Sequence, residues 1–190
     1  MPQVPMLATP HTQDELAAAL TAELAPLGAT ATTGALLLAL SNQETGSASK
    51  MWNENLGNIT TADDSVDWWS TKTGAAKGLH FRAYVSFDDG VRDFVRFINS
   101  RPKLWAASGT GDLSQFAQQI RDSKYNPDLD VAGAAPTLLS FAKRALPLFA
   151  ALPAGPALTL SGGSSGGSGW GGLFLIAGVL WFAIGRKSRG

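Results

Sequence analysis

The stretch SNQETGSASKMWNENLGNI, residues 41–59, joins a predicted helix to a polar loop and decides how the chain folds around it. The residues before it repeat leucine at helical spacing, which predicts a buried helix. Glu44 lies four residues after Leu40 and seven after Leu37, so its side chain emerges on the face of the buried leucines. Gly46 is typical of a helix end. The sequence therefore places one carboxyl group at the rim of the core.

The carboxyl group of Glu44 has two interpretations. Partial burial disfavours the charged carboxylate and raises its pKa, which a general acid needs in order to hold a proton near neutral pH. The alternative is a solvated side chain in the last turn of a helix, the common environment of Glu. The neighbours favour an acid in a saccharide cleft, because amides suit sugar hydroxyls and indoles suit pyranose faces, although each alone also fits a turn or a core. These neighbours are Asn53, Asn55, Asn58, Trp52, Trp68 and Trp69.

The remaining periodicity predicts a mainly helical domain with a small β-lobe. Further helices are expected over residues 13–24, 33–44, 88–98, 112–120 with Asp112 as N-cap, and Thr137 to Leu146 before Pro147. Residues 66–87 carry β-branched and aromatic runs around a turn, which predicts a hairpin. A helical body with one hairpin lobe is a layout that forms a cleft.

Composition divides the chain of 190 residues into one ordinary domain and its appendages. The chain is 45% hydrophobic and 16% charged with a net charge of zero, which excludes a disordered or nucleic-acid-coating protein. There is no cysteine, and no metal-ligand spacing or phosphate-binding loop appears, so neither metal nor cofactor is expected. The predicted segments are an extension over 1–12, the domain over 13–150, a Pro then Gly/Ser-rich linker over 151–169, an apolar helix over 170–186 and a basic tail over 187–190.

The apolar segment 170–186 is expected to be a single-pass membrane anchor. Its charge-free run spans about 24 Å as a helix, slightly short for a bilayer. A buried terminal helix is the alternative, but the Gly/Ser tether and the basic residues after it favour an anchor whose end stays on the cytoplasmic or interior side. The N-terminus lacks the basic and apolar segments of a secretory signal.

Three ordered blocks resemble a known family: LLALSNQETGSASKMWNENLGNI, FRAYVSFDDGVRDFVRFI and FAQQIRDSKYNPD. They are similar to the signatures of bacterial cell-wall glucosaminidases, found in flagellar rod-assembly hydrolases, autolysins and phage lysins. The resemblance covers residues 13–148. It implies a lysozyme-like α+β fold and cleavage of the β-1,4 bond after N-acetylglucosamine in peptidoglycan, an endo-β-N-acetylglucosaminidase activity.

The resemblance also implies roles for individual residues. Glu44 falls on the catalytic acid, and Tyr125 falls on a cleft tyrosine that is often counted as catalytic. Tyr84 falls on a second cleft tyrosine, and Asn55 and Asn58 fall in the block that shapes the cleft floor. Trp52 and Trp68 complete the expected substrate-binding set.

The second catalytic group departs from the family pattern. The family often supplies a Glu from the β-lobe, whereas this chain has no Glu after Glu54. Among Asp63, Asp64 and Asp67, we expect Asp67 to take this role because it begins the predicted lobe strand; a solvated loop is the alternative. The shorter side chain favours a water-mediated or substrate-assisted route and leaves the stereochemistry open. Arg82 is expected either to hold a carboxylate in the cleft or to point outward from its strand.

The leading hypothesis is a membrane-anchored peptidoglycan hydrolase. The alternatives are a lytic transglycosylase, which needs a single acid, and a catalytically inactive glycan-binding or structural virion protein, which the missing lobe Glu would explain. An anchor without a secretory signal fits a bacteriophage whose virion contains a membrane, or a bacterial envelope with the domain facing the periplasm. The expected partners are glycan strands, lipid through residues 170–186 and other virion proteins, with no nucleic acid contact by the domain.

Overall fold

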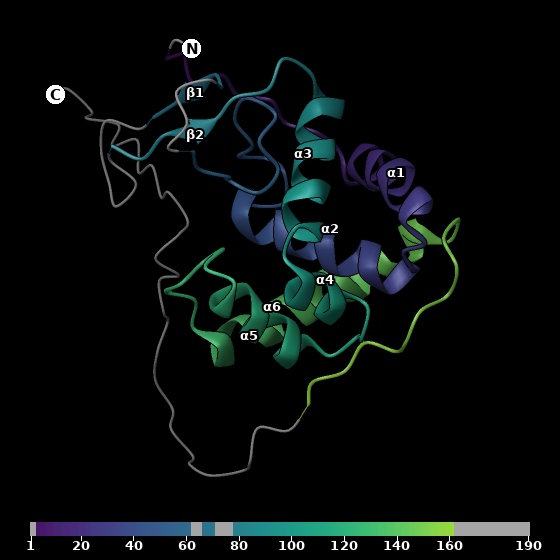
Figure 1. The fold of residues 1–190 in the computed structure, drawn as a ribbon. Coiled ribbons are helices and arrows are strands. Elements are labelled where there is room, and N and C mark those ends of the chain that lie inside the picture. The colour runs from purple at the N-terminus through teal and green to yellow at the C-terminus, as the bar shows by residue number, and fades with distance from the viewer. Residues whose placement is uncertain (1–2, 62–65, 71–77, 162–190) are drawn as a thin grey trace, which may run out of the picture.

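The structure is a computed structural model, and it describes residues 3–61, 66–70 and 78–161 (Figure 1). This part of the chain forms α-helices, two short 3-10 helices and a two-stranded antiparallel sheet. The helices are α1 (Gln13–Leu24), η1 (Ala25–Leu27), α2 (Ala31–Thr45), α3 (Phe87–Asn99), α4 (Pro102–Ser108), α5 (Leu113–Asp122), α6 (Val131–Ala145) and η2 (Leu146–Phe149). Strand β1 (Trp68–Trp69) pairs with β2 (Phe81–Arg82), with Trp68 opposite Arg82. The predicted helical body with a small β-lobe is confirmed.

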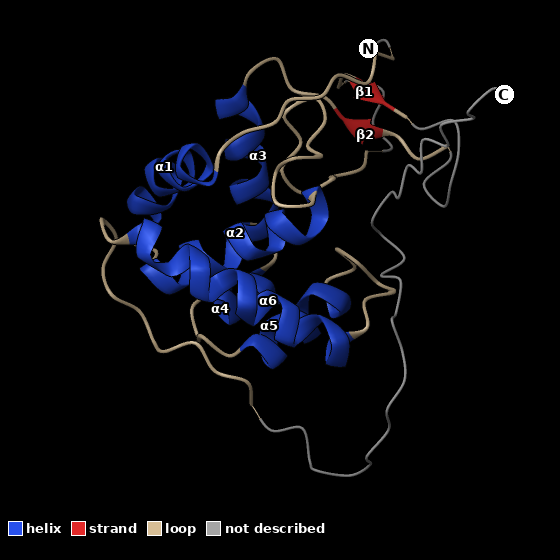
Figure 2. Cartoon of the chain, turned by 180° about the vertical axis from the view of Figure 1, so that it is seen from behind, coloured by secondary structure: helices blue, strands red, loops and turns tan. Residues whose placement is uncertain are grey.

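Helix α2 is the centre of the body. Figure 2 shows it between α1 and α3 on one side and α4, α5 and α6 on the other. All its residues are buried except Glu44, as expected for a helix that is packed on every side. Gly34 permits the close approach of η2, because a Cβ there would lie 2.4 Å from the ring of Phe149. The Leu run before Glu44 therefore forms the core that the sequence predicts.

The helix ends follow local sequence signals. Thr12 and Glu15 form a capping box at α1, and Asp112 accepts backbone hydrogen bonds at the start of α5 as predicted. Gly46 ends α2 with φ of 58°, in the left-handed region where glycine is favoured. The chain then enters the polar loop at the point that the sequence indicated.

Two helices differ from the prediction. The expected start of the last helix at Thr137 is wrong, because α6 begins at Val131 and contains Pro136. Proline removes one backbone hydrogen bond, but α6 packs along α2 and buries apolar side chains on both sides of the proline in sequence, which offsets that loss. Helix α4 was not predicted; its proline at the first helical position is typical of a helix start.

Residues 153–161 continue along the helical body beyond the predicted domain boundary at residue 150. Ala31 N–H donates to the Pro153 carbonyl at 2.9 Å, and Thr159 exchanges backbone hydrogen bonds with the segment that begins α5. The Gly/Ser part of the predicted linker, the predicted anchor over 170–186 and the basic tail lie outside the described residues. Within the described part of the chain, we find no helix with the length and apolar character needed to cross a membrane.

The N-terminal extension pairs with the β-lobe. Val4 N–H donates to the Trp68 carbonyl at 2.8 Å, and Asn53 N–H donates to the Leu7 carbonyl at 2.9 Å. Figure 1 shows this extension beside β1. The lobe is therefore wider than its two short strands.

Candidate active site

Glu44 lies in the last turn of α2, where the helical body meets the lobe loop. Burial raises the pKa of its carboxyl group from an ordinary 4.5 to about 7, and the side chains of Asn58 and Asn126 oppose this shift by hydrogen bonding. The shift follows from the position of Glu44 at the edge of a helix that is otherwise fully buried. A carboxyl group with this pKa holds a proton near neutral pH and can act as a general acid.

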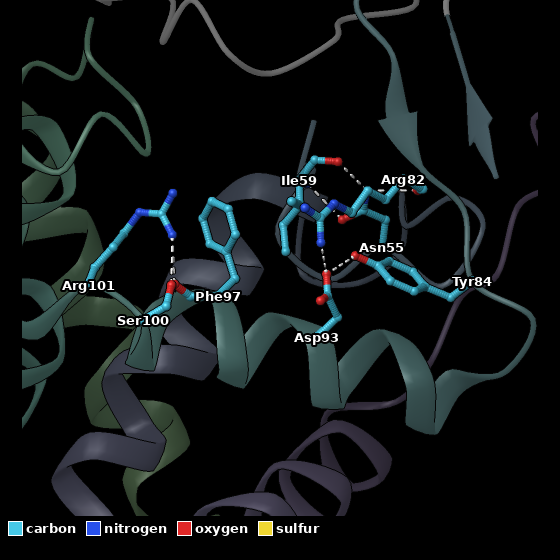
Figure 3. Close-up of polar contacts among 8 residues, drawn as sticks. All are labelled: Asn55, Ile59, Arg82, Tyr84, Asp93, Phe97, Ser100 and Arg101. Carbon is cyan, nitrogen blue, oxygen red and sulfur yellow. Dashed lines mark hydrogen bonds and ion pairs between the residues drawn. The ribbon is translucent and has the colours of Figure 1, made fainter. Parts of the chain in front are cut away.

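The loop after α2 is held by two asparagines with different roles. Asn58 adopts φ of 48°, and its amide donates to the Glu44 carbonyl at 2.7 Å. Asn55 is 0% exposed; its amide oxygen accepts from Ile59 N–H, and its amide nitrogen donates to the carbonyls of Ile59 and Arg82 (Figure 3). Asn55 therefore holds the loop from inside and has no surface for a sugar, whereas Asn58 lies at the acid.

Tyr125 is brought to the same place from the segment after α5. Its hydroxyl donates to the Gly57 carbonyl at 2.7 Å, and its ring meets Phe97 edge-on at 5.7 Å between centroids. Burial raises the pKa of the Tyr125 hydroxyl well above 10, and the charge of Glu44 contributes to the shift. Tyr125 is therefore a protonated phenol beside the acid.

Tyr84 belongs to a polar network between the lobe and α3. Its hydroxyl donates to Asp93 Oδ2 at 2.6 Å, and Arg82 Nη1 donates to the same oxygen at 2.7 Å (Figure 3). Burial raises the pKa of Tyr84, and the hydrogen bond to Asp93 adds to the rise. Of the two roles considered for Arg82, the structure shows the one in which it holds a carboxylate, whereas an outward strand position was the simpler prediction. Sequence reasoning did not single out Asp93; its spacing of four residues from Asp89 was the available signal.

The other predicted site residues lie in the lobe. Asp67 directly precedes β1, and its carbonyl accepts from Ala83 N–H at 2.9 Å, so the predicted strand start is confirmed. Asp63 and Asp64 lie outside the described residues. Trp68 stacks on His80 with centroids 3.6 Å apart, and half-buried Trp52 pairs with the N-terminal extension. Trp69 is buried in the core.

The acid has a defined set of neighbours. The structure brings Glu44, Asn58, Asn126 and Tyr125 together, and Tyr84 of the α3 network contributes to the raised pKa of Tyr125. No carboxylate among the described residues contributes to the pKa of Glu44. In residues 3–61, 66–70 and 78–161 there is also no group of three or more His, Cys, Asp and Glu side chains that would hold a metal ion.

Comparison with solved structures identifies the fold. The chain resembles the peptidoglycan hydrolase from Sphingomonas sp. A1, with a TM-score of 0.56 and 21% identity over 76% of this chain and 95% of that chain. It also resembles the glycoside hydrolase domain of FlgJ from Salmonella typhimurium, with a TM-score of 0.51 and 18% identity over 70% of this chain and 88% of that chain. No protein-family profile and no curated protein sequence matches this chain. The likeness establishes the fold.

Proposed function

We propose that this protein hydrolyses β-1,4 glycosidic bonds of the peptidoglycan glycan strand, as an endo-β-N-acetylglucosaminidase. The observation that carries the proposal is Glu44, a half-buried carboxyl group whose pKa is raised to about 7 by burial. The fold supports it, because similar folds occur in a peptidoglycan hydrolase and a glycoside hydrolase domain. The three ordered sequence blocks support it independently.

Glu44 is assigned as the proton donor to the leaving sugar oxygen. Cleavage of a glycosidic bond needs one carboxyl group that protonates this oxygen while positive charge develops on the sugar ring. Asn58 and Asn126 hydrogen-bond to the carboxyl group, so they orient it and stabilise the carboxylate that remains after proton transfer. The Tyr125 hydroxyl donates a hydrogen bond to the Gly57 carbonyl, which leaves its oxygen lone pairs available to the developing positive charge.

We propose Asp67 as the second catalytic group, which would act on the sugar from the side opposite Glu44. Burial accounts for the raised pKa of Glu44 without a contribution from any described carboxylate. This favours a water-mediated or substrate-assisted route over direct attack by a neighbouring carboxylate. It also favours a second candidate function, a lytic transglycosylase, because that reaction needs only one acid. Hydrolysis releases reducing ends and internal ring closure releases anhydro sugars, so mass spectrometry of the products distinguishes the two reactions.

The decisive experiment compares Glu44→Gln with the matched variant Glu23→Gln on α1. Full-length protein should release soluble glycan fragments from purified sacculi. Glu44→Gln should abolish the release while keeping the wild-type circular dichroism spectrum, and Glu23→Gln should remain active. Full activity of Glu44→Gln would disprove the assignment. Wall binding by the wild type without any released fragments would establish the inactive glycan-binding protein instead.

We also propose that the protein is membrane-anchored through residues 170–186 and associated with a phage virion. This proposal is supported by the sequence alone: the charge-free run, the Gly/Ser tether and the basic end. The full chain should partition with membranes, and a chain that ends at Ser161 should not. Recovery of the protein from host periplasm but never from particles would argue against the virion assignment.

A further inference from the structure

A groove between the lobe and α3 is lined by charged side chains that have no part in proton donation by Glu44. Its volume is about 250 Å³. The polar side chains that line it are Arg82 and Tyr84 from the lobe and Asp89, Arg92, Asp93 and Arg96 from α3.

The α3 residues of the groove form one polar face. Asp89, Arg92, Asp93 and Arg96 follow the spacing i, i+3, i+4 and i+7, which places them in one row along the helix. The other face of α3 carries its buried apolar residues and packs against the core. Helix amphipathicity therefore directs every charge of this row toward the lobe or solvent.

Four of the five charged side chains in the groove form two ion pairs. Asp93 accepts from Arg82 at 2.7 Å and from Tyr84 at 2.6 Å through the same oxygen. Asp89 accepts from Arg92 at 3.1 Å through one oxygen and from Ser86 at 2.7 Å through the other. Both acidic groups of the groove are therefore already neutralised by an arginine.

Arg96 is the fifth charge, and it has no acidic partner among the residues that the structure describes. It lies in the last turn of α3, where the helix dipole favours a cation. The dipole explains how an exposed guanidinium is stable there without a counter-ion. The lining residues thus carry one excess positive charge, and outside the lining Glu23 of α1 lies 3.5 Å from Arg92.

The groove is linked to the candidate active site through side chains of α3. Phe97 follows Asp93 by one turn on α3, and its ring meets that of Tyr125, which lies beside Glu44. Figure 3 shows Asp93, Phe97 and Arg101 in this order along α3 and the residues that follow it, with Tyr84 reaching Asp93 from the segment before α3. This contact joins the helix that lines the groove to the residues around Glu44.

We propose that the groove binds a carboxylate of the peptide stem on the glycan strand, with Arg96 as its charged ligand. The inference rests on the proposed function, because acidic peptide stems distinguish peptidoglycan from neutral polymers of amino sugars such as chitin. A guanidinium suits a carboxylate because its planar fork matches the two oxygens. The groove makes the enzyme selective for strands that still carry acidic stems.

The test removes the negative charge from the substrate and, separately, the positive charge from the protein. The stem carboxylates of purified sacculi are converted to amides with carbodiimide and ammonia, and Arg96→Gln removes the cation from the full-length protein. Arg121→Gln on α5 is the matched control, because that exposed arginine lies outside the groove. Kinetics are measured at low ionic strength, where exposed charges are least screened.

Amidation should raise the wild-type KM about fivefold, the size expected for an exposed charge pair, with kcat unchanged. Arg96→Gln should show the raised KM on untreated sacculi and no further response to amidation. Arg121→Gln should behave as the wild type. An Arg96→Gln variant that responds to amidation as strongly as the wild type would overturn the inference and leave the hydrolase assignment intact.

Failure of the proposed function gives a different result, because the wild type then releases nothing from untreated sacculi. In that case, co-sedimentation of the same proteins with untreated and amidated sacculi tests whether the groove binds stem carboxylates. Binding that weakens on amidation for the wild type but not for Arg96→Gln supports the inference. Equal binding of the wild type to both kinds of sacculi overturns it.

Discussion

The hydroxyl of Tyr125 donates to the backbone carbonyl of Gly57 at 2.7 Å, which ties the segment after α5 to the loop that follows α2. The contact depends on the absence of a side chain at Gly57. A Cβ there would lie 2.6 Å from the Tyr125 hydroxyl and 2.8 Å from the ring of Phe94. The phenol reaches the neighbourhood of Glu44 because this position is glycine.

Gly57→Ala should therefore both destabilise the protein and displace Tyr125. We expect a loss of about 1–3 kcal/mol in the free energy of unfolding, typical of overpacking, together with a fall in kcat. Denaturant unfolding and fragment release from sacculi measure the two effects. Gly109→Ala is the control, because a Cβ there meets its nearest atom at 3.5 Å, an ordinary contact. Unchanged stability and activity in Gly57→Ala would contradict the packing described.

Tyr125→Phe separates the hydroxyl group from the ring. The ring contact with Phe97 is retained, so the lost hydrogen bond should cost only about 1 kcal/mol of stability. If the phenol oxygen stabilises the developing charge, kcat should fall about 100-fold while KM changes little. Tyr84→Phe is the comparison, because its hydroxyl bonds to Asp93 instead. Equal kcat in Tyr125→Phe and the wild type would remove Tyr125 from the reaction.

The pH dependence of activity should report the protonation of Glu44. Because the pKa is raised to about 7, the acid is protonated below that pH, and kcat should fall about tenfold per pH unit above it. A pH profile on sacculi measures this descending limb. Activity that is flat from pH 6 to about 9 would exclude Glu44 as the proton donor.

The same group should make the stability of the fold depend on pH. A pKa that is higher in the folded chain than the ordinary 4.5 means that the folded state binds the proton more tightly. This contribution is fully present below the unfolded pKa and is lost as the pH rises through about 7. We expect a loss on the order of 2 kcal/mol, allowing for the part of Glu44 that meets solvent. Glu44→Gln should lack this loss when unfolding is measured at both ends of the range.

Asp93→Asn tests the network that holds the lobe against α3. The amide oxygen still accepts from Tyr84, but the ion pair with Arg82 is lost; because both side chains are partly exposed, stability should fall by about 1 kcal/mol. KM should rise because the groove loses its fixed geometry. Asp122→Asn on α5 is the exposed control and should change neither quantity. A wild-type KM in Asp93→Asn would show that the network does not position the groove.

The local features of the site were predictable, whereas its long-range pairs were not. The position of Glu44 at the core rim follows from its spacing to Leu40, and the structure confirms it. The pairing of Asp93 with Arg82 depends on how α3 docks against the lobe, which helical periodicity does not contain. Likewise, all three loop asparagines suit a turn, but packing alone decides that Asn55 is buried while Asn58 reaches Glu44.

The described part of the chain ends beside the start of α5. Ser161 N–H donates to Asp112 at the start of α5, and both views show this end of the body away from the β-lobe (Figures 1 and 2). If residues 170–186 are the proposed anchor, the tether joins the body on the side away from the β-lobe. Under the proposed function, this arrangement lets the β-lobe lie on the side away from the bilayer, and the length of the tether limits how far the proposed active site can extend into the cell wall.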